Sequence, residues 1–245
     1  MTTIIPVYNR PAMLCKAVQS VLGQSWRPIE IVIVDDGSTD DTGAVADRLA
    51  REHPDVIRVL HVANGGPGWA REQGRRAARG EFVQYLDSDD WLLPGKFAGQ
   101  VQALRNQPDC GVAYGKTRLV DEAGRVLQAP FKRTGERLDT LFPALLVDRW
   151  WNTHTPLYRR SLCNEVGGWS NMRMGEDWEY DARVGATGTR LAFCDQFVSD
   201  TCQHAQTRLT GAGKLSPGML RDFGRLVPVL FRSTRAQIPL ALMTL

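Results

Sequence analysis

The first hundred residues alternate between short, continuously apolar runs and stretches whose apolar residues recur at helical spacing. The predicted strands cover residues 2–8, 29–34, 56–62 and 81–86, and the predicted helices cover residues 13–22, 40–49 and 68–78. Strands that are apolar throughout are typical of a parallel sheet covered on both faces. Strand–helix alternation therefore predicts an α/β protein with a mostly parallel, Rossmann-like central sheet and helices on both faces.

Each predicted strand ends in polar side chains. They are Asn9 after the first strand, Asp35 and Asp36 after the second, Asn64 after the third, and Asp87 and Asp89 after the fourth. Ligands of such sheets bind at the carboxyl ends of the strands. Because these side chains all follow strand ends, we expect them to converge on one edge and form a polar ligand site.

Asp87 and Asp89 form a D-x-D pattern within the sequence LDSDD. Oxygen ligands at this spacing suit a hard divalent cation such as Mg²⁺ or Mn²⁺, which takes further ligands from substrate phosphates. The pattern alone is weak, because surface turns are rich in Asp. Its position after a buried strand favours a metal site. The first strand is not followed by G-x-G-x-x-G, and no P-loop is present, so a glycine cradle for a pyrophosphate is not expected.

The second half of the sequence is less regular. It predicts a hairpin with its turn at residues 122–124, a helix over 137–148, a strand over 152–160 followed by a short helix, a helix over 175–188 and a strand over 190–204. The hairpin predicts a small second sheet. We expect a single domain over residues 1–215, with a nucleotide-binding half (1–110) and an acceptor-binding half (111–215).

Composition limits the class of protein and its surroundings. A net charge of +3, with scattered Lys and Arg, gives no reason to expect a nucleic-acid partner. Five cysteines without a C-x-x-C spacing fit a reducing compartment, and no signal peptide or bilayer-spanning stretch is visible. The apolar tail over residues 216–245 is predicted to be helical. It fits a membrane-surface helix, a core helix or the beginning of a longer chain.

Five motifs occur in a fixed order: IIPVYNR, VDDGSTDDT, NGGPGWARE, YLDSDD and GEDWEYDARV. In this order and spacing they resemble the family-2 glycosyltransferases, over about residues 2–205. The resemblance implies the GT-A fold, an inverting reaction and a nucleotide-sugar donor.

The resemblance also implies roles for individual residues. Nucleotide binding falls to Pro6, Tyr8, Asn9, Asp36, Arg71 and Asp87, with Asp36 at the base and Asp87 at the ribose; metal binding falls to Asp89 and His204; the catalytic base is Asp177, with Glu176 as the second choice. The sequence around His204, CQHAQT, is a loose match to the family's pattern. A lone histidine is also more often structural than a ligand. The residues themselves suggest Trp150 and Trp151 for the acceptor site, because adjacent side chains cannot easily share one buried face.

We therefore expect a metal-dependent inverting transferase that moves a sugar from a nucleotide-diphosphate sugar, by default a UDP-sugar with Mn²⁺ or Mg²⁺, to an acceptor hydroxyl. A glycan or lipid-linked acceptor in bacterial cell-envelope or surface-polysaccharide synthesis is expected, at a cytoplasmic site with peripheral membrane contact through the tail. Two alternatives remain. A non-catalytic nucleotide-sugar-binding subunit would not need the acidic residues, and a sugar nucleotidyltransferase would release pyrophosphate instead of a nucleoside diphosphate.

Overall fold

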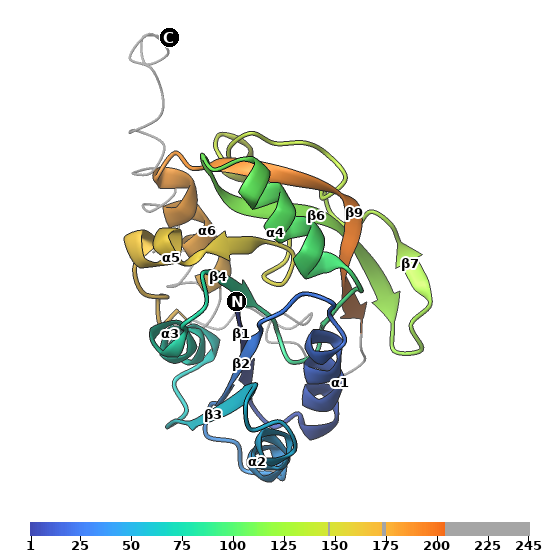
Figure 1. Ribbon diagram of the computed structural model, residues 1–245, viewed down its shortest axis with the longest axis vertical. Helices are drawn as coiled ribbons and strands as arrows, with labels where there is room; N and C mark the ends of the chain where they lie inside the picture. Colours follow the sequence, from blue (N-terminus) through green and yellow to red (C-terminus); the bar gives the residue numbers. More distant parts are fainter. Residues whose placement is uncertain (147, 173–174, 204–245) are drawn as a thin grey trace, which may run out of the picture.

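The computed structural model describes residues 1–146, 148–172 and 175–203 (Figure 1). Its strands form one nine-stranded sheet in the order β3-β2-β1-β4-β8-β6-β9-β5, with β7 paired to β6. The strands are β1 (Thr2–Val7), β2 (Glu30–Asp35), β3 (Ile57–His61), β4 (Phe82–Tyr85), β5 (Trp91–Leu92), β6 (Cys110–Asp121), β7 (Val126–Gln128), β8 (Leu157–Arg159) and β9 (Arg190–Gln203). The predicted hairpin is present as β6 and β7, and it extends the main sheet instead of forming a second one.

Helices cover both faces of this sheet (Figure 1). They are α1 (Pro11–Leu22), α2 (Thr42–Glu52), α3 (Pro67–Ala77), α4 (Lys96–Asn106), α5 (Arg160–Val166) and α6 (Glu176–Ala186). Alternate residues of β1 divide between two cores, with Ile5 packed among α1, α2 and α4, and Ile4 packed among α3, α5 and α6. This alternation is the strand period of two, and it explains why the strands are apolar throughout.

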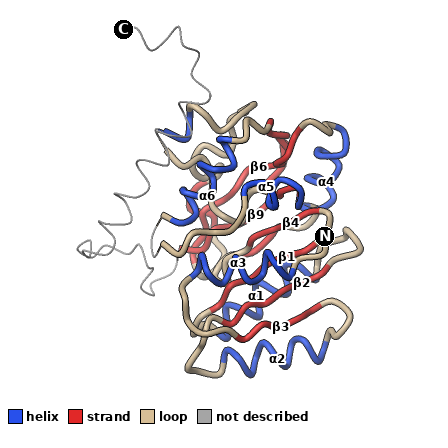
Figure 2. Tube along the Cα trace, turned by 90° about the vertical axis from the view of Figure 1, so that its left-hand side faces the viewer, coloured by secondary structure: helices blue, strands red, loops and turns tan. Residues whose placement is uncertain are grey.

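The first four strands of the chain are parallel and lie side by side as β3-β2-β1-β4 (Figure 2). In the register of β1 and β2, Val7 lies opposite Asp35. The residues that follow each strand therefore leave the sheet at a common carboxyl edge. This is the edge at which the polar strand ends were predicted to converge.

The second half returns to the same edge by a different route. β8 is antiparallel to both β4 and β6, and β6 is parallel to β9, so β9 runs in the direction of β4. The end of β9 thus reaches the turn that follows β4, where the Cys202 amide donates to Asp90 Oδ1 at 3.0 Å. Residues more than a hundred positions apart are joined at this edge.

The second helix begins later than predicted, and neither Ser38 nor Thr39 caps it. α2 starts at Thr42 with Asp41 before it. The Asn9 amide donates to Ser38 Oγ, and the Thr39 amide donates to Asn9 Oδ1 at 2.8 Å. These side chains join the ends of β1 and β2 and are not available to the helix.

The helix predicted over residues 137–148 is wrong, and α4 was not predicted. The described part of 137–148 contains one short 3₁₀ turn, Ala144–Leu146. Pro143 cannot donate a helical hydrogen bond, the Leu138 amide donates to Tyr114 Oη, and the Asp139 carbonyl accepts from Leu191. Tertiary partners use the groups that a helix would need.

Candidate active site

Two adjacent carboxylates end β2 and have different partners. Asp35 accepts from the Ser38 amide at 3.1 Å and lies 3.0 Å from His61 Nδ1. The contacts of Asp35 are therefore with a neighbouring backbone amide and a histidine ring. Asp36 accepts from the amides of Gly65 and Gly66, at 2.9 and 2.8 Å, one on each oxygen. Burial raises the pKa of Asp36, and the two amides oppose this shift.

The loop after β1 lies against the loop after β2. Asn9 takes a left-handed backbone conformation, φ 52°, which Asn tolerates better than most residues. Its amide side chain bonds Thr39. Tyr8 is 46% exposed, while Pro6 is buried within β1. Asp36 itself is buried, at 4% exposure. The nucleotide-binding roles of these residues stay predictions.

The D-x-D turn after β4 is held by arginines. Arg71 Nη2 donates to Asp87 Oδ1 at 2.6 Å, and Arg10 Nη1 pairs with Asp89 Oδ2. The side chains of Asp87 and Asp89 remain partly exposed, at 28% and 15%. The cations therefore hold the turn without covering its carboxylates.

Asp90, which is buried, holds the same turn through contacts with His154 and Cys202. Its Oδ2 lies 2.8 Å from His154 Nδ1, and its Oδ1 accepts from Cys202. Among the described residues, Asp87, Asp90 and His154 bring one ligand atom each within 4.8 Å of one another. The two carboxylates are ligands that suit Mg²⁺ or Mn²⁺, whereas an imidazole is more typical of Zn²⁺ and other transition metals. Asp89, the predicted metal ligand, is not part of this group. The chemistry of this turn thus fits a divalent cation, whereas His204 lies outside the described residues.

The acidic pair begins α6, as predicted, and Arg71 links it to the D-x-D turn. Arg71 Nη1 donates to Glu176 Oε1 at 2.8 Å, while its other terminal nitrogen bonds Asp87. The guanidinium is buried and lies 4.9 Å from the centre of the Trp169 ring. Burial would lower the pKa of Arg71, but Asp87 and Glu176 outweigh it and raise that pKa, so the group stays charged.

The two neighbouring acids differ in exposure and in pKa. Burial raises the pKa of Glu176 despite its pairing with Arg71, and its side chain is 10% exposed. Burial would also raise the pKa of Asp177, but Arg149 and Arg71 outweigh it and lower that pKa. The Asp177 side chain is 30% exposed. Asp177 is thus the more accessible and more readily ionised carboxylate of the pair, and divergent pKa values are typical of paired catalytic acids.

Two side chains that organise the site were not predicted from the sequence, and the expectation for one pair of residues is wrong. Arg149 and His154 were not singled out, because each acts through a contact with a residue far away in the sequence. Trp150 and Trp151 are both buried, at 2% and 0% exposure, so the premise that one of the doublet must be exposed is wrong. Their place in the acceptor site stays a prediction that requires the surrounding chain to open.

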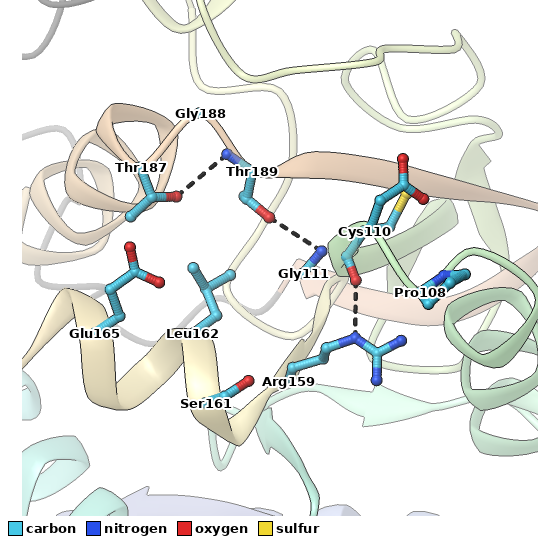
Figure 3. Close-up of a pocket in the computed structure, with 11 residues that line it drawn as sticks. Pro108, Cys110, Gly111, Arg159, Ser161, Leu162, Glu165, Thr187, Gly188 and Thr189 are labelled. Atoms are coloured by element: carbon cyan, nitrogen blue, oxygen red, sulfur yellow. Dashed lines mark hydrogen bonds between the residues drawn. The ribbon is translucent and has the colours of Figure 1, made fainter.

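A pocket of about 230 Å³ lies elsewhere (Figure 3). It is lined by Cys110 at the start of β6, by Thr189 just before β9 and by Arg159 at the end of the antiparallel strand β8. These positions belong to the amino edge of β6 and β9. The pocket is therefore at the edge of the sheet opposite the acidic site.

Comparison with known proteins identifies the family. The profile described as "Glycosyl transferase family 2" matches residues 2–167. The chain belongs to glycosyl transferase family 2. This family member is 30% identical over 210 residues to an uncharacterized glycosyltransferase, EpsJ, of Bacillus subtilis, covering 80% of this chain and 59% of that protein. It is 39% identical over 129 residues to an uncharacterized glycosyltransferase of Nostoc sp., covering 50% of this chain and 40% of that protein.

Solved structures show that this family 2 glycosyltransferase has the GT-A fold. S. aureus TarS in complex with UDP-GlcNAc superposes with a TM-score of 0.76 at 18% identity, covering 96% of this chain and 69% of the TarS chain. A mannosyltransferase of Pyrobaculum calidifontis, in complex with GDP-Man and Mn²⁺, gives 0.63 at 19% identity, covering 96% and 73%. At these identities the likeness concerns the fold. Within the described residues, no helix is long and apolar enough to cross a bilayer.

Proposed function

We propose that this protein is an inverting, metal-dependent glycosyltransferase that moves a sugar from a nucleotide-diphosphate sugar, most simply a UDP-sugar, to an acceptor hydroxyl. One observation carries the proposal. The buried guanidinium of Arg71 bonds both Asp87 of the D-x-D turn and Glu176 of the acidic pair. The proposed donor-binding carboxylate is thereby joined to the acidic pair that contains the proposed base, Asp177, and a single in-line displacement requires both groups in one site.

The chain's own residues then divide the work. Asp36, Tyr8 and Asn9 bind the base of the donor, and Asp87 binds its ribose. Asp89 and Asp87 would hold a divalent cation, which when bound would supply positive charge against the leaving diphosphate. Asp177 accepts the proton of the acceptor hydroxyl as that oxygen attacks the anomeric carbon.

The acceptor and the setting belong to the same proposal. A glycan or lipid-linked hydroxyl in bacterial cell-envelope synthesis fits a family whose relatives here are bacterial glycosyltransferases. A cytoplasmic enzyme that touches the membrane through residues 216–245 fits the apolar sequence of that tail. The proposal also includes a single domain over residues 1–215, with a nucleotide-binding half (1–110) and an acceptor-binding half (111–215). The tail lies outside the described residues.

A binding and turnover experiment tests the proposal. The thermal midpoint of unfolding is measured with UDP, GDP and dTDP, each with and without Mn²⁺, because a ligand at 100 times its Kd adds about 2.7 kcal/mol of stability. We expect stabilisation by UDP that depends on Mn²⁺ and disappears with EDTA or in Asp89→Ala. Asp109→Ala, an exposed carboxylate at the opposite edge, is the matched control and should bind as the wild type does.

The product distinguishes the remaining classes of function. Release of a nucleoside diphosphate from the nucleotide sugar supports glycosyl transfer. Pyrophosphate release would identify a nucleotidyltransferase, and donor binding without turnover would identify a binding subunit. Turnover that is unchanged by EDTA would remove the metal from the proposal.

A further inference from the structure

A second arginine, Arg149, joins the candidate base to a buried acid on the same helix. Arg149 Nη1 pairs with Asp177 Oδ2, and its Nε donates to Asp181 Oδ2 at 2.8 Å. Asp177 and Asp181 are four positions apart in α6 and so lie on one face, one turn from each other. One guanidinium therefore spans both carboxylates, a geometry that a planar fork of donors allows and a single ammonium does not.

Asp181, the buried partner of Arg149, is held rigidly. The Asp181 side chain is 1% exposed, and its second oxygen accepts from the Tyr158 hydroxyl at 3.2 Å. Arg149 is itself 8% exposed, and its Nη2 lies 3.4 Å from Thr153 Oγ1. A buried carboxylate with an ion-pair partner and a hydrogen-bond donor has little freedom to move. The partly exposed Asp177 is thus tied, through Arg149, to a fixed point in the core.

Asp177 is also held from its own backbone. Its Oδ1 accepts from the Trp178 amide at 2.8 Å, while Arg149 occupies one side of Oδ2. Each carboxylate oxygen can accept two hydrogen bonds, so the partners within the described residues leave one position on each oxygen for a substrate hydroxyl. With both oxygens fixed, the free positions have defined directions.

We propose that Arg149 is the positioning residue of the catalytic base: it fixes the direction in which Asp177 meets the acceptor hydroxyl, and Asp181 anchors it. The inference rests on the proposed function, since it assigns to Asp177 the proton transfer described above. Arg149 makes no contact with the D-x-D turn among its described bonds, which go to Asp177, Asp181 and Thr153. Its loss should therefore affect turnover and leave donor binding intact.

Arg149→Lys is the decisive variant, because the cation stays available to the buried Asp181 while the span to Asp177 is lost. We expect kcat to fall by about tenfold or more, as for other losses of base orientation, with the Kd for UDP and Mn²⁺ within about twofold of wild type. Arg183→Lys is the matched control, since Arg183 pairs with Glu179 on the same helix. It should leave both quantities unchanged.

A double-mutant cycle separates positioning from a general structural role. If Arg149 acts through Asp177, adding Arg149→Lys to Asp177→Asn costs little further activity. An equal fold-loss in both backgrounds, or a wild-type kcat for Arg149→Lys, overturns the inference. Should Arg149→Lys show no cooperative thermal transition, Asp181→Asn replaces it in the same cycle under the same criteria. A wild-type protein that releases no nucleoside diphosphate would instead remove the proposed function, and this inference with it.

Discussion

At the end of β2, Asp36 is held by the backbone amides of Gly65 and Gly66, whereas at the start of α6, Asp177 is held by the guanidinium of Arg149. The amides are neutral, so burial is the larger effect and the pKa of Asp36 is raised. The guanidinium is charged, and the pKa of Asp177 is lowered although burial acts in the opposite direction. The pKa values of the two carboxylates are thus shifted in opposite directions, which fits the different tasks proposed for them.

The difference indicates which task each partner suits. Backbone amides fix the shape of a loop and leave the carboxylate as the local negative charge, which suits recognition of a donor N–H. A side-chain cation keeps a carboxylate ionised inside the protein, so that it can accept a proton, and fixes its direction. The lowered pKa also makes the carboxylate a weaker base, so the contribution proposed for the cation is orientation. The proposed donor and acceptor sides of the site therefore differ in electrostatics as well as in topology.

The largest expected effect comes from removing the base. Asp177→Asn keeps the shape of the side chain, but an amide cannot accept the acceptor's proton. General-base assistance is typically worth about 10²–10⁴-fold, so transfer should fall by a factor of that order while the Kd for UDP and Mn²⁺ stays close to wild type. Nucleoside diphosphate release at saturating donor measures the first quantity, and calorimetric titration measures the second.

Glu176→Gln is the companion variant on the neighbouring position. It leaves Arg71 paired with Asp87 and removes one of its two ion pairs, so the milder loss should appear in both donor affinity and turnover. A near-wild-type rate for Asp177→Asn together with an inactive Glu176→Gln would move the base by one residue. Activity in both variants would mean that the acids are only the first turn of a helix.

These halves also differ in how much of them the sequence predicts. The donor half follows from local rules: continuous apolar strands, helices between them and polar residues after each strand, which place Asp36 and Asp87 at one edge. In the acceptor half, α6 and its acidic start were predicted, but their partners were not. Arg71 and Glu176 are 105 positions apart, and only tertiary packing brings them together. Tertiary packing also prevents the helix predicted over 137–148. There Tyr114 and Leu191 form hydrogen bonds with backbone groups that the helix would need.

A smaller effect is expected from the donor side. Asp36→Asn retains one acceptor oxygen but turns an NH₂ group toward one of the two glycine amides. The proposed hydrogen bond from the base of UDP to the Asp36 carboxylate also loses its charged acceptor. Because a hydrogen bond to a charged group is typically worth about 1.5–3 kcal/mol, the Kd for UDP should rise by about tenfold or more, with kcat at saturating donor nearly unchanged. Equilibrium titration of UDP measures this change. An unaltered Kd would take Asp36 out of the nucleotide site.

Asp35→Asn is the matched control for that variant, one residue earlier on the opposite side of β2. Asp35 bonds Ser38 and His61 and is 5% exposed. Its replacement should lower the free energy of unfolding more than it changes the Kd for UDP. If Asp35→Asn mainly raises the Kd for UDP and Asp36→Asn mainly lowers the free energy of unfolding, the roles assigned to Asp35 and Asp36 must be exchanged.

The smallest expected effect is a pH dependence of stability from His61. Hydrogen bonds to Asp47 and Asp35, at 2.9 and 3.0 Å, raise the pKa of His61 above its ordinary value. A raised folded-state pKa means that the charged ring stabilises the fold fully below the unfolded pKa of about 6.5, and that this contribution is lost as pH rises through the folded pKa. Because the His61 side chain is 51% exposed, solvent screening keeps the contribution below about 1 kcal/mol.

The difference in free energy of unfolding between wild type and His61→Gln should therefore be larger at pH 6 than at pH 9, as measured by urea titration. His53→Gln, at the end of α2, serves as the control for the replacement of a histidine by glutamine. If the difference in free energy of unfolding between wild type and His61→Gln is the same at pH 6 and pH 9, the positive charge of His61 does not stabilise the fold. The contacts of the ring with Asp47 and Asp35 would then contribute only through the uncharged imidazole.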